Sequence, residues 1–118
     1  MLRQFIARHI ENAGHLEVLF LLHRPPQRTW APFEVTRELR SNQYSVDRWL
    51  ALLAERGLVL AESEGYRFHA ASPDLQRCVD ELAQIYQIRP SAVIEEIHSQ
   101  PNRQLMDFVR AFELRKKT

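Results

Sequence analysis

The feature that most limits the possible folds of this chain is a pair of short amphipathic helices. A tight turn joins them, and a hairpin follows directly. Residues 31–57 read APFEVTRELRSNQYSVDRWLALLAERG and are followed by LVLAESEGYRFHA. Pro32 suits the first turn of a helix, where its missing N–H costs nothing. Asn42 suits an N-cap, because its side chain can accept a hydrogen bond from an exposed backbone N–H. Gly57 fits the left-handed position that ends a helix.

The apolar residues of this segment predict which helix faces are buried. In the helix expected over residues 43–56, Val46, Leu50 and Leu53 recur at i, i+4 and i+7. This spacing places them on one stripe, which can pack against neighbouring helices. The preceding helix has an expected inner face of three apolar residues: Phe33, Val35 and Leu39.

The residues before this unit predict two further helices and a strand. Residues 2–12 have apolar side chains at helical spacing, and we expect the sequence Asn12-Ala13-Gly14 to break that helix. The run LEVLFLLH, which follows His15, is apolar on nearly all sides and predicts a buried central helix ended by Pro25-Pro26. Residues 27–30 can add one strand to a small sheet.

The residues after the second helix predict a hairpin and then more helices. We expect strands at 58–60 and 66–69, joined by a turn at 62–65. Ser72 precedes Pro and Asp, which is a strong helix start. The helix that it caps has a wide apolar stripe: Leu75, Cys78, Val79, Leu82, Ile85 and Tyr86. Two shorter helices are expected, one after Ser91 and one over residues 102–114 with a basic end at 115–117.

Length and composition predict one compact domain. The chain has 118 residues, of which 45% are hydrophobic, so it can bury a core without disulfides or metal. We expect a unit of residues 15–70, with residues 1–14 and 71–118 as flanking helices. The chain contains no run of about 18 apolar residues and no signal-peptide pattern, which favours a soluble, cytoplasmic protein that does not enter a membrane. Cys78, the single cysteine, is expected to be buried.

The segment from Leu16 to His69 resembles the winged helix-turn-helix domain of bacterial transcriptional regulators of the MarR-like and ArsR-like type. The resemblance lies in the helix LEVLFLLH, the helix FEVTRELR, the turn SN, the helix YSVDRWLALLAERGLV and the hairpin LAESEGYRF. It covers a little under half of the chain, and VDRWLALLAERGLV is its strongest part. It implies a mainly α fold with a small β-hairpin wing and flanking N- and C-terminal helices.

The resemblance also implies a DNA-binding transcription regulator. In such proteins the second helix of the motif enters the major groove and the wing touches the adjacent backbone. The residues that would contact base edges are Gln43, Tyr44, Asp47 and Arg48. Those that would contact phosphates are Arg40 and Arg67, with Arg28 as a weaker candidate. The flanking helices would form a homodimer, whose geometry sets the half-site spacing on double-stranded DNA.

Charge distinguishes this chain from a typical member and leaves a second function open. Residues 28–69 contain six arginines and six acidic residues, and the overall net charge is only +1. Glu62 and Glu64 stand near the tip of the wing, and Asp47 stands in the middle of the reading face. Arg40 and Arg48 can equally be solvated and paired with Asp47 or Glu38. The alternative is therefore a winged-helix protein–protein interaction module that engages a protein partner and no DNA.

No sequence motif indicates catalysis, a cofactor or a metal. Three scattered glycines provide no phosphate-binding loop, and the five histidines have no H-x-x-x-H or Cys/His spacing. His15 and His23 are expected to be ordinary residues at helix ends. Trp49 is expected to pack, whereas Tyr44 is equally compatible with packing and with a contact surface. We therefore expect no enzyme activity and no cofactor.

Overall fold

The computed structural model describes residues 2–25 and 27–99 of the chain. Within these residues the elements are α1 (Leu2–His9), α2 (Ala13–His23), β1 (Thr29–Trp30), α3 (Pro32–Leu39), α4 (Gln43–Glu55), β2 (Val59–Glu62), β3 (Gly65–Phe68), α5 (Pro73–Ile88) and α6 (Pro90–His98). The helix expected over residues 102–114 and its basic end lie outside the described residues.

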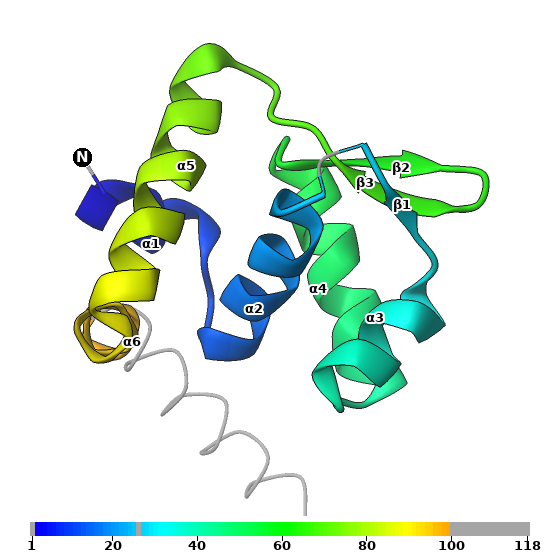
Figure 1. The fold of residues 1–118 in the computed structure, drawn as a ribbon, viewed down its shortest axis with the longest axis horizontal. Coiled ribbons are helices and arrows are strands. Elements are labelled where there is room, and N and C mark those ends of the chain that lie inside the picture. Colours follow the sequence, from blue (N-terminus) through cyan, green and yellow to red (C-terminus); the bar gives the residue numbers. More distant parts are fainter. Residues whose placement is uncertain (1, 26, 100–118) are drawn as a thin grey trace, which may run out of the picture.

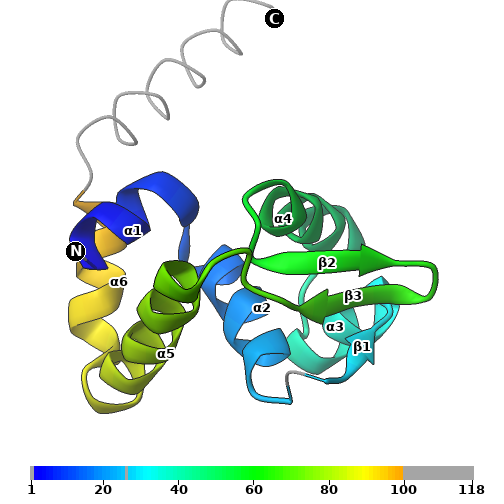
Figure 2. The ribbon, with the colours of Figure 1, turned by 90° about the horizontal axis from the view of Figure 1, so that it is seen from above.

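The elements are arranged with α2 in the centre. Figures 1 and 2 both show α1, α5 and α6 grouped at one end of the molecule and the three-stranded sheet at the other, with α2 between them. Helix α2 contacts α3, α4 and β3, while α6 contacts α1 and α5. No described helix is long and apolar enough to cross a membrane.

The predicted core of the helical unit is confirmed. Val46, Leu50 and Leu53 of α4 are fully buried, and so are most of the apolar residues of α2. Gly14 lies where α2 begins, and a Cβ atom at this position would overlap the indole ring of Trp49. A glycine therefore lets α2 and α4 approach closely at this point, and Trp49 packs as expected.

The sheet is antiparallel in the order β1-β3-β2, so the strand predicted near residues 27–30 is present. The predicted hairpin turn is one residue too wide at each end, because Glu62 of β2 pairs with Gly65 of β3 in the ladder. Only Ser63 and Glu64 form the tip. Gly65 has a φ of 150° and is buried against the backbone of Trp30. Gly57 ends α4 with a φ of 76°, as expected.

The boundary between the first two helices differs from the prediction. Helix α1 ends at His9, and Asn12 caps α2 by accepting a hydrogen bond from the backbone N–H of His15 at 2.9 Å. Ala13 and Gly14 therefore belong to α2 and do not break a helix. His15 is fully buried, so the expectation of an ordinary terminal residue is wrong for it.

Two apolar residues predicted to face the core are exposed. Phe33 is 61% exposed, because Val35 sets the inner face of α3 and a residue two positions away lies about 200° around the helix. Ile85 is 37% exposed, because it stands at the edge of the α5 stripe. The buried part of that stripe consists of Cys78, Val79 and Leu82.

We expect Gly65→Ala to destabilise the protein. A Cβ atom would overlap the carbonyl oxygen of Trp30, and the backbone conformation at this position is one that L-residues rarely adopt. Strain and overpacking of this kind cost about 1–3 kcal/mol each. Urea unfolding would measure the loss, with Ser63→Ala at the exposed tip as the control. Equal stability of the two variants would contradict the close contact between β3 and β1.

Candidate nucleic-acid interface

The turn between α3 and α4 is built by three residues, Arg40, Ser41 and Asn42. Arg40 has left-handed backbone angles, φ 52° and ψ 42°, and its N–H bonds back to α3. The backbone N–H of Ser41 donates to the carbonyl of Thr36 at 3.0 Å. The side chain of Asn42 accepts from the N–H of Ser45 at 2.8 Å, so the predicted N-cap is confirmed. The first two residues of α4 after this turn, Gln43 and Tyr44, are exposed.

The left-handed conformation of Arg40 is unusual. Among the described residues it is the only one other than glycine with a positive φ. For a residue with a Cβ this conformation costs about 1–2 kcal/mol, and glycine would adopt it without that cost. Strained backbone conformations of this kind occur often at functional sites. Arg40 is exposed and lies at the turn where the candidate interface begins.

The four predicted base-contacting residues lie together on the exposed face of α4. Gln43, Tyr44, Asp47 and Arg48 are all exposed, and Tyr44 is 82% exposed. The amide of Gln43 donates to Asp47 at 2.7 Å and accepts from the hydroxyl of Thr36 at 3.3 Å. The carboxylate of Asp47 is thus bonded along its own helix. A Gln–Asp pair of this kind presents both donors and acceptors to a ligand.

Arg48 is paired, but with neither of the partners considered from the sequence. Its Nη2 atom lies 3.4 Å from Oε2 of Glu11, which stands between α1 and α2. The alternative of pairing with Asp47 or Glu38 is therefore wrong for Arg48. Sequence reasoning missed this contact because 37 residues separate the two partners.

Arg67 lies on β3, the central strand of the sheet, and forms an ion pair with Glu62. Its Nε atom lies 3.3 Å from the carboxylate of Glu62, which also accepts from the hydroxyl of Thr29 at 2.7 Å. The hydroxyl of Thr29, followed by the guanidinium of Arg67, holds the pKa of Glu62 below its ordinary value. Glu62 therefore ties β1 to the hairpin, and Glu64 is the acidic residue left at the tip.

Arg28 lies beside the sheet with two partners. Its guanidinium stacks over the ring of Trp30 at 3.5 Å, and Nη2 lies 3.3 Å from Glu34. Glu34 in turn accepts from the backbone N–H of Ala31 at 2.8 Å, which caps α3. That N–H, with a further contribution from Arg28, lowers the pKa of the Glu34 carboxyl.

Phe33 and Arg37 extend the candidate interface, and sequence reasoning did not assign them to it. Arg37 lies 6.0 Å from the exposed ring of Phe33, one turn along α3. Neither Arg37 nor Arg40 forms an ion pair with any residue that the structure describes. The 200° offset of Phe33 from Val35 was the available signal. The two arginines are therefore ready to bind an anion.

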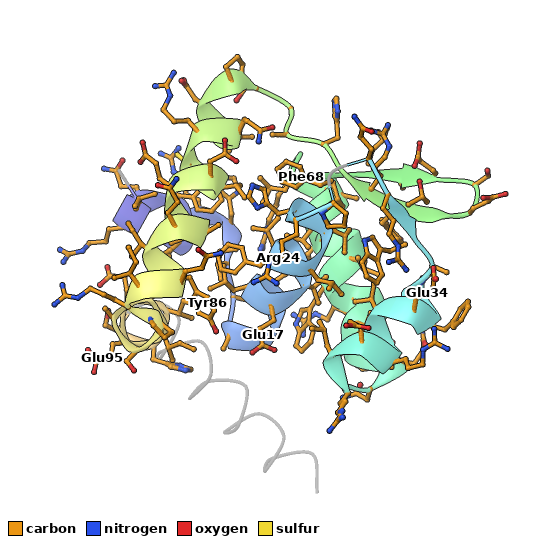
Figure 3. All side chains as sticks on the ribbon, viewed as in Figure 1. Glu17, Arg24, Glu34, Phe68, Tyr86 and Glu95 are labelled. Carbon is orange, nitrogen blue, oxygen red and sulfur yellow. The ribbon has the colours of Figure 1, made fainter. Side chains whose placement is uncertain are left out.

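A concave surface lies between α2 and α5. It has a volume of about 670 Å³, and Figure 3 shows Tyr86 of α5 beside Glu17 of α2 and Arg24, the residue that follows α2, all of which line it. At its edge, Nε2 of His23 lies 2.7 Å from the carboxylate of Asp80. In the described part of the chain, His, Cys, Asp and Glu form no cluster that could hold a metal ion.

The fold is a winged helix-turn-helix, with α3 and α4 as the motif, β2 and β3 as the wing, and α1, α5 and α6 as flanking helices. A structure similar to it is that of MepR, described as a transcription regulator of the Staphylococcus aureus multidrug efflux pump MepA. The TM-score is 0.51 and the sequence identity 12%, and the match covers 99% of this chain and 90% of that chain. This likeness confirms the predicted mainly α fold with a β-hairpin wing. No protein-family model matches the chain, and no curated protein is similar to it in sequence.

We expect Thr29→Val to raise the pKa of Glu62 toward its ordinary value, because the hydroxyl of Thr29 is the main cause of its depression. Arg67→Gln should also raise it, because the guanidinium of Arg67 is the next cause of the depression. A depressed carboxyl pKa stabilises the folded state above the unfolded-state value of about 4.3, and this contribution is lost as the pH falls through the folded value. NMR titration of the Glu62 carboxyl carbon would measure the shift. An unchanged pKa of Glu62 in Thr29→Val would contradict the role of the Thr29 hydroxyl.

Proposed function

We propose that this protein is a transcription regulator that binds double-stranded DNA, with α4 in the major groove. One observation carries the proposal: α4 buries one face completely and presents Gln43, Tyr44, Asp47 and Arg48 on the opposite face, next to a tight turn. A helix held in this way can enter a groove without disturbing the core. A protein with this function would act in the cytoplasm.

Each residue of the interface has a proposed role. Gln43 pairs with adenine, Arg48 with guanine, and Asp47 accepts from cytosine. Arg40 and Arg67 contact phosphates, and Arg28 is a weaker candidate for the same role. The structure supports adding Phe33 and Arg37, one as an apolar contact to a thymine methyl group and the other as a phosphate contact.

We also propose that the protein acts as a homodimer formed by α1, α5 and α6. Ile88 is 79% exposed and Ile85 37% exposed on α5, and two isoleucines on one helix end favour a protein contact over solvent. A twofold axis through these helices would present two copies of α4 to DNA. The copies would then read half-sites about 34 Å apart.

The second candidate function is a winged-helix module that engages a protein partner and no DNA. The observation that favours it is the pairing of Arg28, Arg48 and Arg67 with Glu34, Glu11 and Glu62. Paired arginines contribute less to phosphate binding, because each must first leave its carboxylate. The exposed pairs are worth only about 0–1 kcal/mol each, however, so DNA can displace them.

We expect affinity for duplex DNA to fall steeply with salt. Four phosphate-contacting arginines in each protomer, Arg28, Arg37, Arg40 and Arg67, would release about eight counterions from a dimer, giving a slope of log K against log salt of about −7. Fluorescence anisotropy with random duplex DNA would measure it, and light scattering of the same sample should give twice the chain mass. Binding that is absent even at low salt would leave the protein-interaction module as the function.

We expect Arg40→Gly to weaken DNA binding without destabilising the fold. Glycine relieves the left-handed strain, so the unfolding free energy should be unchanged or higher by up to about 1 kcal/mol. The lost phosphate contact should reduce the salt slope by about 1 for each protomer. Arg77→Ala, which removes an arginine from the exposed side of α5, is the matched control and should leave DNA binding unchanged. Equal losses in both variants would point to net charge alone and would remove Arg40 from the interface.

A further inference from the structure

Glu11 lies near two arginines, Arg48 of α4 and Arg56, the residue that follows α4. Its Oε2 atom is 3.4 Å from Nη2 of Arg48, and its Oε1 atom is 3.8 Å from Nη2 of Arg56. The side chain of Glu11 is 29% exposed, that of Arg48 47% and that of Arg56 25%. One carboxylate therefore serves two cations that differ in their access to solvent.

The position of Glu11 is determined by the start of α2. Its backbone N–H donates to Nδ1 of His15 at 3.1 Å, and the ring of His15 is fully buried. Asn12, the next residue, caps α2, and Gly14 lies against Trp49 of α4. The backbone of Glu11 is thus tied to the same helix end that packs against α4. This position keeps the side chain of Glu11 within reach of both arginines.

The two arginines are held unequally. Arg56 also donates from Nη1 to the backbone carbonyl of His9 at 2.8 Å, a contact that does not depend on Glu11. The described residues offer Arg48 no other charged partner, and its distance of 3.4 Å is longer than the 2.7–2.9 Å of a strong charge-assisted hydrogen bond. Arg48 can therefore leave while Arg56 stays, and the carboxylate keeps a cation beside it.

We propose that Glu11 is a positioning residue that competes with DNA for Arg48. In the unbound protein it holds the guanidinium of Arg48 beside the segment that joins α1 to α2. When DNA enters, Arg48 moves from the carboxylate to the DNA, and Arg56 continues to neutralise Glu11. Glu11 thereby lowers the affinity for all DNA and sets how strongly a site must attract Arg48 before it binds. This inference rests on the proposed function.

The test is a double-mutant cycle between Glu11→Gln and Arg48→Ala, read as affinity for duplex DNA. An exposed ion pair is worth up to about 1 kcal/mol, so Glu11→Gln should tighten binding about two- to fivefold. In the Arg48→Ala background the same substitution should change binding less than about 1.5-fold, because the arginine that it releases is gone.

Two controls separate this role from simpler ones. Glu55→Gln removes a carboxylate that lies on α4 and forms no ion pair within the described residues. Its effect on DNA affinity should be the same with and without Arg48. Glu11→Asp keeps the charge but shortens the side chain, so it should also tighten binding if the contact matters. Thermal unfolding should show that the Glu11 variants remain folded, since Arg56 keeps its bond to His9.

Each outcome either supports the inference or overturns it. A gain in affinity that disappears with Arg48 supports the inference. An equal gain in both backgrounds would show that Glu11 acts only as a nearby negative charge, and unchanged or weaker binding would exclude competition; either result overturns the inference while the proposed function stands. If the wild-type chain and all variants fail to bind DNA at low salt, the proposed function fails and this inference fails with it.

Discussion

The packing of α4 against α2 is the interaction on which the rest of the structure depends. Val46, Leu50 and Leu53 are fully buried, and each contributes about 1.5–3 kcal/mol by leaving water. Gly14 permits the close approach at one end of this contact, where Trp49 covers the start of α2. The exposed ion pairs around it are worth about 0–1 kcal/mol each, so packing decides the position of α4. The charges then decide what its outer face can bind.

Most of the arginines in the candidate interface already pair with a carboxylate. Arg28, Arg48 and Arg67 each have one acidic partner, while Arg37 and Arg40 have none among the residues that the structure describes. Such a surface is nearly neutral at long range and attracts DNA weakly from a distance. At contact, phosphates can displace the weak pairs. Pairing of this kind favours selective binding over tight, indiscriminate binding.

The wing shows how a residue that looks unfavourable in sequence acquires another role in three dimensions. Considered alone, Glu62 would repel the phosphates that the wing is proposed to contact. In the fold it bonds to Thr29 and Arg67, and so joins the strand before α3 to the hairpin after α4. The sheet order β1-β3-β2 makes this possible, because Thr29 and Leu60 lie on either side of Arg67. Glu62 therefore has a structural role, and its ion pair leaves Arg67 less available to bind another anion.

The sequence by itself determined the order of helices and strands, the buried stripe of α4, the N-caps at Asn42 and Ser72 and the exposed face with Gln43, Tyr44, Asp47 and Arg48, because these follow from local periodicity and capping chemistry. It did not determine that Phe33 is exposed or that α2 starts at Ala13. Only the tertiary structure decided which carboxylate each arginine meets. Glu11 and Arg48 are 37 residues apart, and ion pairs of this length depend on how helices pack rather than on spacing along the chain.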